Sequence, residues 1–319
     1  MRFAVQDGPF VNAVPRRVVV REVGLRDGLQ SIATIVPTDR KKDWVATAYA
    51  AGMREIEVGA FVPPRLVPQL ADTVEVLEFA RTLPGLFASA LVPNLQGAER
   101  AFAAGAHLVI LPLSASRAHS LANLRRTPDE VLAELARLRA GRDAAGAATR
   151  IECGIGTAFG CTLQGRVEPD EVLRLLQAAL DAGADHVSLA DTVGYADPGA
   201  VERLFAAALR IAGERFWCAH FHDTRGLALA NAAAALRLGV ARFDASLAGI
   251  GGCPQAPGAS GNATSEDLVF MLEAMGCDTG VDLMALLELR RRVVAWIPDE
   301  VTYGSLWRAG LPRTSGDAT

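Results

Sequence analysis

The chain has 319 residues, half of them hydrophobic, with 32 Lys and Arg against 36 Asp and Glu and a formal net charge of -4. This length suits a single α/β barrel, which needs roughly 250 residues. A slightly acidic chain argues against a nucleic-acid surface, and no run approaches the ~20 apolar residues of a membrane span. The five cysteines form no C-x-x-C pair, which argues against a disulfide framework and favours a cytoplasmic location.

Short β-branched or apolar runs alternate with longer Ala- and Leu-rich stretches. We expect eight strands, near residues 18–23, 55–60, 87–92, 107–113, 150–156, 186–191, 216–222 and 242–248. We expect helices near residues 39–51, 69–82, 95–104, 128–140, 169–182, 198–212, 226–238 and 265–275, with one more near 282–296. Strands that alternate with helices indicate a parallel sheet. Eight such units predict a closed (β/α)8 TIM barrel rather than an open sheet.

Capping residues support these boundaries. Four glycines lie just after expected helices, where glycine commonly ends a helix: Gly52, Gly105, Gly183 and Gly239. Three prolines lie at or near expected helix starts: Pro128, Pro169 and Pro198. Thr38 is the expected cap of the first helix. We predict a single catalytic domain over residues 1–319, with the barrel over about 18–280 and an additional C-terminal helix over about 282–297.

Polar residues gather at the ends of the expected strands, and active sites of TIM barrels lie at the C-terminal ends of the strands. The residues at or after these ends are Arg26, Asp27, Glu57, Asp191, His220, His222, Cys253 and Asn262. We therefore expect several separate segments to bring polar groups to one mouth of the barrel.

His220 and His222 are two residues apart on a strand and share one face. Two imidazoles in an apolar strand are costly unless they bind something, so we favour metal binding over a pair of core histidines. Asp27 and Asn262 are the natural partners, although alone they are more typical of a turn and a loop. Two imidazoles, a carboxylate and an amide oxygen suit Mg2+ or Mn2+ better than zinc.

Two of the remaining candidates, Arg26 and Cys253, have two interpretations each. Arg26 would either hold an enolate or carboxylate with a forked donor or form a weak surface salt bridge. Glu57 could fix that guanidinium, and Glu22, which is polar within the first strand, could support it by hydrogen bonding. Cys253 lies in the glycine-rich segment 249–254, which is either a flexible loop or a lid that brings an acid or base over the metal.

Together these residues resemble the 3-hydroxy-3-methylglutaryl-CoA (HMG-CoA) lyase family of metal-dependent TIM-barrel enzymes. The matching segments are residues 22–30, 61–62, 67–72, 92–95, 188–194, 220–224, 249–254, 258–262 and 266–268. The most specific of them reads Gly-Ile-Gly-Gly-Cys-Pro at residues 249–254. The resemblance covers about residues 18–297, which is nearly the whole chain.

The resemblance implies a role for each candidate residue. The implied ligands of Mg2+ or Mn2+ are Asp27, His220, His222 and Asn262. Arg26 would stabilise the enolate of the departing acyl-CoA, and Cys253 would be the loop thiol in proton transfer. Supporting or substrate-orienting roles would fall to Gln30, Glu57, Asp191 and Glu266.

The implied reaction is retro-Claisen cleavage of HMG-CoA to acetyl-CoA and acetoacetate, a step of leucine degradation and ketone-body formation. Asp27 and His220 are both candidates for the base that takes the hydroxyl proton. Cys253 or His220 would supply the proton to the enolate carbon. The partner is then an acyl-CoA substrate, and a homodimer or higher homo-oligomer is plausible by resemblance.

Two segments differ from the family pattern. Residues 31–33 read Ser-Ile-Ala where the family commonly has Asn-Glu-Lys, and residues 162–164 read Thr-Leu-Gln where it often has Pro-Tyr-Glu. A related hydroxyacyl-CoA thioester is therefore an alternative substrate. Further alternatives are a Claisen-condensing acyltransferase of the isopropylmalate or homocitrate synthase type, a more distant 4-hydroxy-2-ketoacid aldolase, and a non-catalytic barrel that binds metal or acyl-CoA.

Overall fold

The computed structural model of the protein describes residues 14–252 and 261–312. Eight parallel strands close into a barrel in chain order, and β1 pairs with β8. The strands are β1 Val19–Glu22, β2 Glu55–Ala60, β3 Phe87–Leu91, β4 Leu108–Ser114, β5 Arg150–Gly156, β6 His186–Asp191, β7 Phe216–Phe221 and β8 Arg242–Ala245. The predicted TIM barrel is confirmed.

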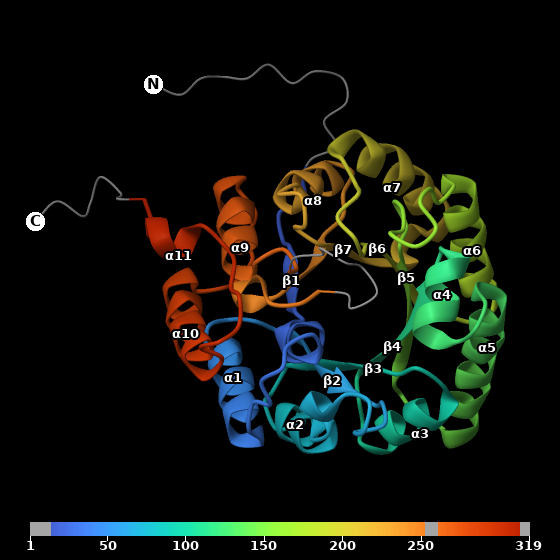
Figure 1. Ribbon diagram of the computed structural model, residues 1–319, viewed down its shortest axis with the longest axis horizontal. Coiled ribbons are helices and arrows are strands. Elements are labelled where there is room, and N and C mark those ends of the chain that lie inside the picture. The colour runs from blue at the N-terminus through green and yellow to red at the C-terminus, as the bar shows by residue number, and fades with distance from the viewer. Residues whose placement is uncertain (1–13, 253–260, 313–319) are drawn as a thin grey trace, which may run out of the picture.

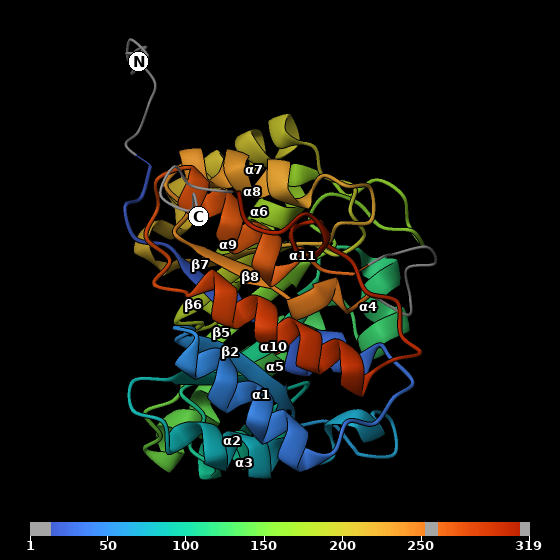
Figure 2. The same ribbon diagram turned by 90° about the vertical axis from the view of Figure 1, so that its left-hand side faces the viewer.

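Helices form a ring around the strands, as Figure 1 shows. The long helices that follow the strands are α1 Thr38–Ala50, α2 Thr73–Arg81, α3 Leu95–Ala103, α5 Pro128–Ala145, α6 Pro169–Asp181, α7 Pro198–Ala212, α8 Ala228–Arg237 and α9 Ser265–Ala274. The additional helix α10, Leu283–Trp296, packs on the outside between α1 and α9 (Figure 2). None of the helices in the described part of the chain is long and apolar enough to cross a membrane.

Most of the residues predicted to begin or end helices do so in the structure. Each of the four glycines predicted to end helices has a positive φ, between 74° and 100°. Each of the three prolines is the first residue of its helix. The prediction for Thr38 was wrong, because Pro37 takes the cap position and the Thr38 hydroxyl donates instead to Asp72 Oδ2 at 2.8 Å.

Some boundaries differ from the expectation. The sequence predicts an eighth strand to residue 248, but β8 ends at Ala245. The chain then turns, because the Leu247 N–H bonds to Glu22 Oε1 at 3.0 Å and Ala248 adopts a left-handed φ of 58°. The short helices that were not foreseen include these three: η1 Gly24–Gly28, α4 Arg117–Leu124 and α11 Leu306–Ala309. All three are additions to the eight-fold βα pattern and carry no repeat signal.

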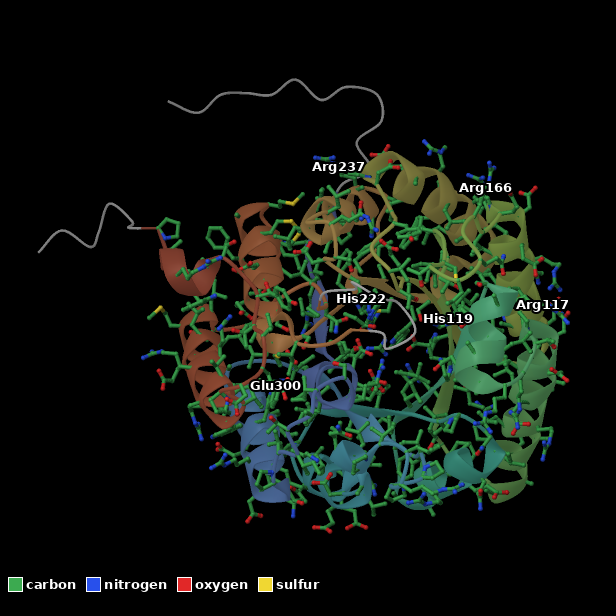
Figure 3. The ribbon with its side chains drawn as sticks, viewed as in Figure 1. Arg117, His119, Arg166, His222, Arg237 and Glu300 are labelled. Carbon is green, nitrogen blue, oxygen red and sulfur yellow. The ribbon has the colours of Figure 1, made fainter. Side chains whose placement is uncertain are left out.

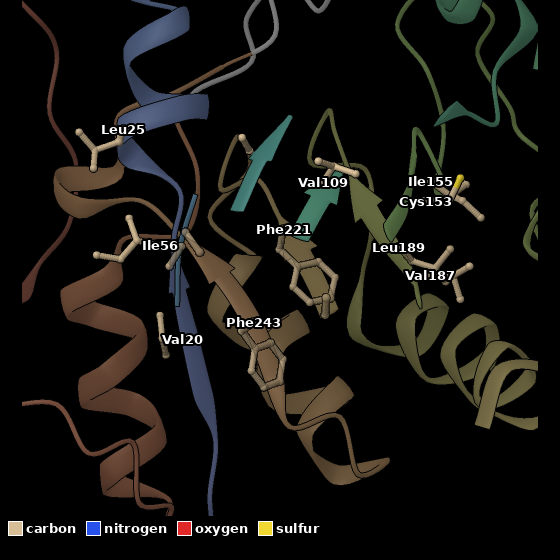
Figure 4. Packing of buried hydrophobic residues seen from close by; sticks show 14 of the residues in the cluster. Val20, Leu25, Ile56, Val109, Cys153, Ile155, Val187, Leu189, Phe221 and Phe243 are labelled. Carbon is tan, nitrogen blue, oxygen red and sulfur yellow. The ribbon is translucent and has the colours of Figure 1, made fainter. Parts of the chain in front are cut away.

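Side chains alternate along each strand, so that one set points outward to the helices and the other points inward to the barrel axis. The outward-facing side chains are apolar and pack between sheet and helices, among them Phe221 of β7 and Phe243 of β8 (Figure 4). Phe221 stacks on Phe205 of α7 with ring centroids 5.8 Å apart. Many of the inward-facing side chains are charged: Arg21 of β1 donates to Glu152 on β5 and to Asp244 on β8. Bulky aliphatic residues usually fill a TIM barrel. A barrel filled with charges is therefore built around a polar centre.

Candidate active site

The turn η1 holds Arg26 and Asp27 above β1. The backbone N–H groups of Arg26 and Asp27 both donate to the Val23 carbonyl, at 3.0 and 2.7 Å. Gly24 makes this tight turn possible, since a Cβ there would lie 2.4 Å from Glu22 Oε1. The two candidate residues are thus fixed by the local backbone at the C-terminal end of the first strand.

Glu22 ties η1 to the end of β8. Its carboxylate accepts hydrogen bonds from the Gly24 N–H at 2.8 Å, the Leu247 N–H at 3.0 Å and the Ser265 hydroxyl at 2.6 Å. Burial raises the pKa of Glu22 to about 7, although these three donors act in the opposite direction. Glu22 therefore supports the site from outside it, by joining β1, β8 and α9.

Asp27, His220 and His222 converge at the mouth of the barrel. All three are buried, and one possible ligand atom from each lies within 4.8 Å of the other two. His222 Nε2 lies 3.8 Å from Asp27 Oδ2, and the two imidazole centroids are 5.0 Å apart. Figure 3 places His222 near the middle of the ring of helices. This geometry suits a single cation held by mixed N and O ligands.

Asn262 completes the cluster. Its backbone bridges to His222, and its Nδ2 donates to Asp27 Oδ2 at 2.8 Å and to the Ile250 carbonyl at 3.1 Å. Its Oδ1 is buried and meets no donor in residues 14–252 and 261–312. Buried polar atoms are rarely left unpaired. An amide oxygen in this position, beside a carboxylate and two imidazoles, fits a metal ligand.

Two backbone segments meet beside Asn262. A Cβ on Gly261 would lie 1.4 Å from the Gly249 carbonyl oxygen, so both ends of segment 249–261 are in contact. Gly251, with a φ of 134°, approaches Asn262 so closely that a Cβ would lie 2.2 Å from Nδ2. The candidate thiol Cys253 lies outside the described residues.

Asp244 is a site residue that the sequence analysis missed. Its Oδ2 lies 3.0 Å from His220 Nδ1, which leaves Nε2 of that ring for the metal cluster. Burial lowers the pKa of His220, but Asp244 outweighs it and the pKa is raised. Burial would raise the pKa of Asp244, yet Arg21 and His220 hold it well below its usual range. A carboxylate that orients a histidine ligand from behind is a common feature of metal sites.

Arg26 is held by carboxylates on both sides. Its Nη1 donates to Asp27 Oδ1 at 2.6 Å, and its Nε lies 2.8 Å from Glu57 Oε1. Gln30 Nε2 also donates to Asp27 Oδ1, at 2.9 Å. Burial raises the pKa of Asp27, but Arg26 and the two histidines outweigh this effect and lower it, so Asp27 stays ionised. Glu57 and Gln30 thus position the pair formed by Arg26 and Asp27.

The buried charges around the barrel axis do not cancel. The arginines are Arg21 and Arg26, and the carboxylates that contact them or the histidines are Asp27, Glu57, Glu152 and Asp244. Formally, two positive charges face four negative ones. Uncompensated buried charge is costly. A divalent cation between Asp27 and the histidines would supply the missing positive charge.

Asp191 shapes the loop after β6. Its carboxylate accepts the N–H groups of Tyr195 at 2.8 Å and Ala196 at 2.9 Å, and its carbonyl accepts the His222 N–H at 3.3 Å. Burial raises the pKa of Asp191, against the effect of these amides. The Asp191 side chain therefore fixes the loop after β6, and its main-chain carbonyl holds the backbone of His222 just after β7.

Glu266 contacts Arg290 and the turn after β8. It accepts Arg290 Nε at 2.5 Å and the Ala248 N–H at 3.2 Å, and so fixes the left-handed turn after β8. Burial raises the pKa of Glu266 to about 8 and lowers the pKa of Arg290, since each charge has lost water. Its place in the structure is that of a supporting residue.

The two segments that differ from the family pattern, residues 31–33 and 162–164, both form hydrogen bonds with other parts of the chain. The N–H groups of Ala33 and Thr34 donate to Glu300 Oε1 at 3.0 and 2.9 Å. Gln164 Oε1 accepts the Ser116 hydroxyl at 3.0 Å. The residues of these segments thus make contacts of their own within the fold.

A family model described as HMGL-like matches residues 17–293. The chain belongs to the HMGL-like family. It is 38% identical to the hydroxymethylglutaryl-CoA lyase YngG of Bacillus subtilis, over 90% of this chain and 94% of that protein. It is 39% identical to the mitochondrial hydroxymethylglutaryl-CoA lyase of Bos taurus, over 87% of this chain and 85% of that protein.

Solved structures of this HMGL-like family have the same fold. An HMG-CoA lyase from Acinetobacter baumannii, in complex with coenzyme A and 3-methylmalate, matches with a TM-score of 0.88 and 40% identity, over 97% of this chain and 99% of that one. The carboxyl transferase domain of Rhizobium etli pyruvate carboxylase matches with a TM-score of 0.68 but 19% identity, which shows a shared fold alone.

Proposed function

We propose that this HMGL-like protein is a metal-dependent carbon–carbon lyase that cleaves HMG-CoA to acetyl-CoA and acetoacetate. The observation that carries the proposal is the buried cluster of Asp27, His220 and His222, with the unpaired Oδ1 of Asn262 beside it. The relatives named above are HMG-CoA lyases that match most of the chain. They favour cleavage over the condensing and aldolase alternatives.

Asp27, His220, His222 and Asn262 would hold the divalent ion, which we propose to be Mg2+ or Mn2+. When bound, such an ion supplies positive charge that makes a substrate hydroxyl easier to deprotonate. The oxygen and nitrogen donors of this cluster suit these ions better than zinc.

Arg26 is the proposed stabiliser of the enolate. Glu57 and Asp27 hold its guanidinium from two sides, so it meets the developing charge without having to reorganise. Donors fixed in place before the reaction are worth more than mobile ones. Cleavage of the carbon–carbon bond leaves an acyl-CoA enolate, whose charge Arg26 would balance.

Asp27 and His220 are the two candidate bases. The pKa of Asp27 is lowered, which makes its carboxylate a weak base, and His220 would have Nε2 on the ion and Nδ1 on Asp244. We propose that one of these two groups takes the proton of the tertiary hydroxyl. His220 or Cys253 would then give a proton to the enolate carbon, with Cys253 carried over from the family pattern.

The substrate class follows from the relatives. One of them was solved with coenzyme A and 3-methylmalate, which together resemble the two ends of a hydroxyacyl-CoA thioester. We propose an acyl-CoA partner for this chain on that basis, with a related hydroxyacyl-CoA thioester as the alternative. A cytoplasmic location, a homo-oligomeric state and a place in leucine degradation and ketone-body formation are further proposals.

The test is release of acetoacetate from HMG-CoA, measured with added Mg2+ or Mn2+ and again after chelation. We expect cleavage that chelation abolishes and metal restores, and no cleavage by the Arg26→Gln protein. Absence of cleavage by folded, metal-loaded wild type would refute the substrate. Full activity in the presence of excess chelator would refute the metal.

A further inference from the structure

A cavity of about 470 Å3 opens at the end of the barrel opposite the metal cluster. Five of its lining residues are the first residues of strands: Val19, Glu55, Phe87, Arg150 and Arg242. The metal cluster lies at the other ends of the same strands, so the barrel separates the two places. A volume of this size is within the range of small-molecule sites, which is roughly 300–1,000 Å3.

The cavity is strongly basic. Its lining contains Arg17, Arg54, Arg150 and Arg242, with Glu55 as the only carboxylate among its lining residues. Arg242 Nε pairs with Glu55 Oε1 at 3.1 Å. Within residues 14–252 and 261–312, no carboxylate lies within ion-pair distance of Arg17, Arg54 or Arg150. Three guanidinium groups therefore share one cavity without a counter-charge from the described chain.

Aromatic rings hold two of these arginines in place. The guanidinium carbon of Arg242 lies 3.9 Å from the centroid of the Trp217 ring, and that of Arg150 lies 5.8 Å from the rings of both Phe87 and Trp217. His186 also packs on Trp217, with ring centroids 3.9 Å apart. Since two side chains already contact the indole, the cavity favours small anions over a stacked nucleobase.

The third cavity arginine is held by the backbone. Arg54 Nη1 donates to the Tyr49 and Met53 carbonyls at 2.8 and 3.0 Å, which leaves its other N–H groups for a ligand. An anionic oxygen among the arginines would supply the counter-charge that the described residues lack.

We propose that this cavity is a binding site for a small, multiply charged oxyanion that carries phosphate or carboxylate groups. A guanidinium group can donate two parallel hydrogen bonds to a phosphate or to a carboxylate. The proposal is independent of lyase activity, because none of the cavity residues takes part in the candidate active site.

The test is calorimetric titration of the purified full chain, without added metal, with inorganic pyrophosphate and separately with citrate. We expect saturable binding of at least one anion, and loss of affinity by roughly 10- to 100-fold in Arg17→Gln and Arg150→Gln. Both side chains are exposed, so the variants should fold, and circular dichroism checks this. Pyrophosphate and citrate distinguish a phosphate site from a carboxylate site.

Two further variants make the test selective. Arg291→Gln, on the outer surface of α10, changes the net charge equally and should bind like the wild type. Arg26→Gln separates this cavity from the active site, which could also attract anions. Loss of binding in Arg26→Gln with retention in Arg150→Gln, or absence of saturable binding of both anions by wild type, would overturn the proposal.

Discussion

His220 and Asp244 show why single residues of the site were harder to predict than the metal ligands. The pair of histidines is visible in the sequence because the two residues lie on one face of one strand. Asp244 lies on the next strand and meets His220 only through the register of β7 and β8, in which the two residues are directly paired. Arg21 and Glu152 were missed for the same reason, since they meet across the barrel.

Replacing Asp244 with Asn should weaken metal binding. The Asn side chain removes the negative charge that orients His220 and raises its pKa. Loss of such a partner typically lowers metal affinity by about 10- to 100-fold. Calorimetric titration with Mn2+ measures the affinity. Asp181→Asn is the matched control, because it makes the same change at an exposed residue of α6. Equal Mn2+ affinity of the Asp244→Asn and wild-type proteins would contradict this role.

Glu22 should make folding stability depend on pH. Its folded pKa of about 7 lies above its ordinary value of 4.5, so the folded protein holds a proton that the unfolded chain has released. The contribution of Glu22 to folding stability is fully present below about pH 4.5 and is lost as the pH rises through about 7. The unfolding free energy should fall by about 3 kcal/mol over this range.

Urea unfolding between pH 4.5 and 8 measures this dependence. In Glu22→Gln the side chain no longer titrates. The unfolding free energy of this variant should therefore lack most of the decrease of about 3 kcal/mol between pH 4.5 and 8. A Glu22→Gln protein with the same pH slope as wild type would show that other groups cause the dependence.

At the scale of elements, the segment after α10 fastens the turn after β8 and the segment after η1, which flank the parts of the chain that carry Asn262 and Asp27. The Tyr303 N–H donates to the Ala248 carbonyl at 2.8 Å, and Arg290 donates both to Tyr303 O and to Glu266. Glu300 binds the other loop, after η1. The sequence predicts α10 from its helical pattern, but it cannot predict these contacts, because they are single hydrogen bonds between irregular segments.

Replacing Arg290 with Met should destabilise the protein. Arg290 is 3% exposed and its partner Glu266 is fully buried, so the change removes the hydrogen-bond partner of a buried carboxyl group. Such losses typically cost about 1–3 kcal/mol of unfolding free energy. Arg291→Met is the neighbouring control, because that side chain is exposed and should change stability by less than about 0.5 kcal/mol. Similar urea midpoints for the two variants would disprove the argument.

At the scale of the whole molecule, the alternation of strands and helices was sufficient to predict the closed barrel and its outer helix. It could not predict what fills the barrel, because a strand pattern says which residues share a face but not which of the two faces turns inward. The polar interior, with its excess of carboxylates, became visible only when all eight strands were in register.

This charge excess predicts that metal stabilises the fold. A divalent ion at 100 times its dissociation constant should add about 2.7 kcal/mol to the unfolding free energy. Thermal melts with and without Mn2+ measure the effect, which His222→Ala should reduce strongly. His107→Ala is the control, because its imidazole lies at the other end of the barrel, beside Phe87. An Mn2+-induced shift of the same size in the His222→Ala protein would contradict the assignment.

The contact between Gly249 and Gly261 has a practical consequence for protein engineering. A segment whose two ends already touch can be exchanged as a cassette, since a replacement has to span almost no distance. The entropic cost of closing it grows only slowly with its length. Libraries that vary the length and composition of residues 254–260, with Ile250, Gly251 and Cys253 kept, should therefore leave Asn262 in place.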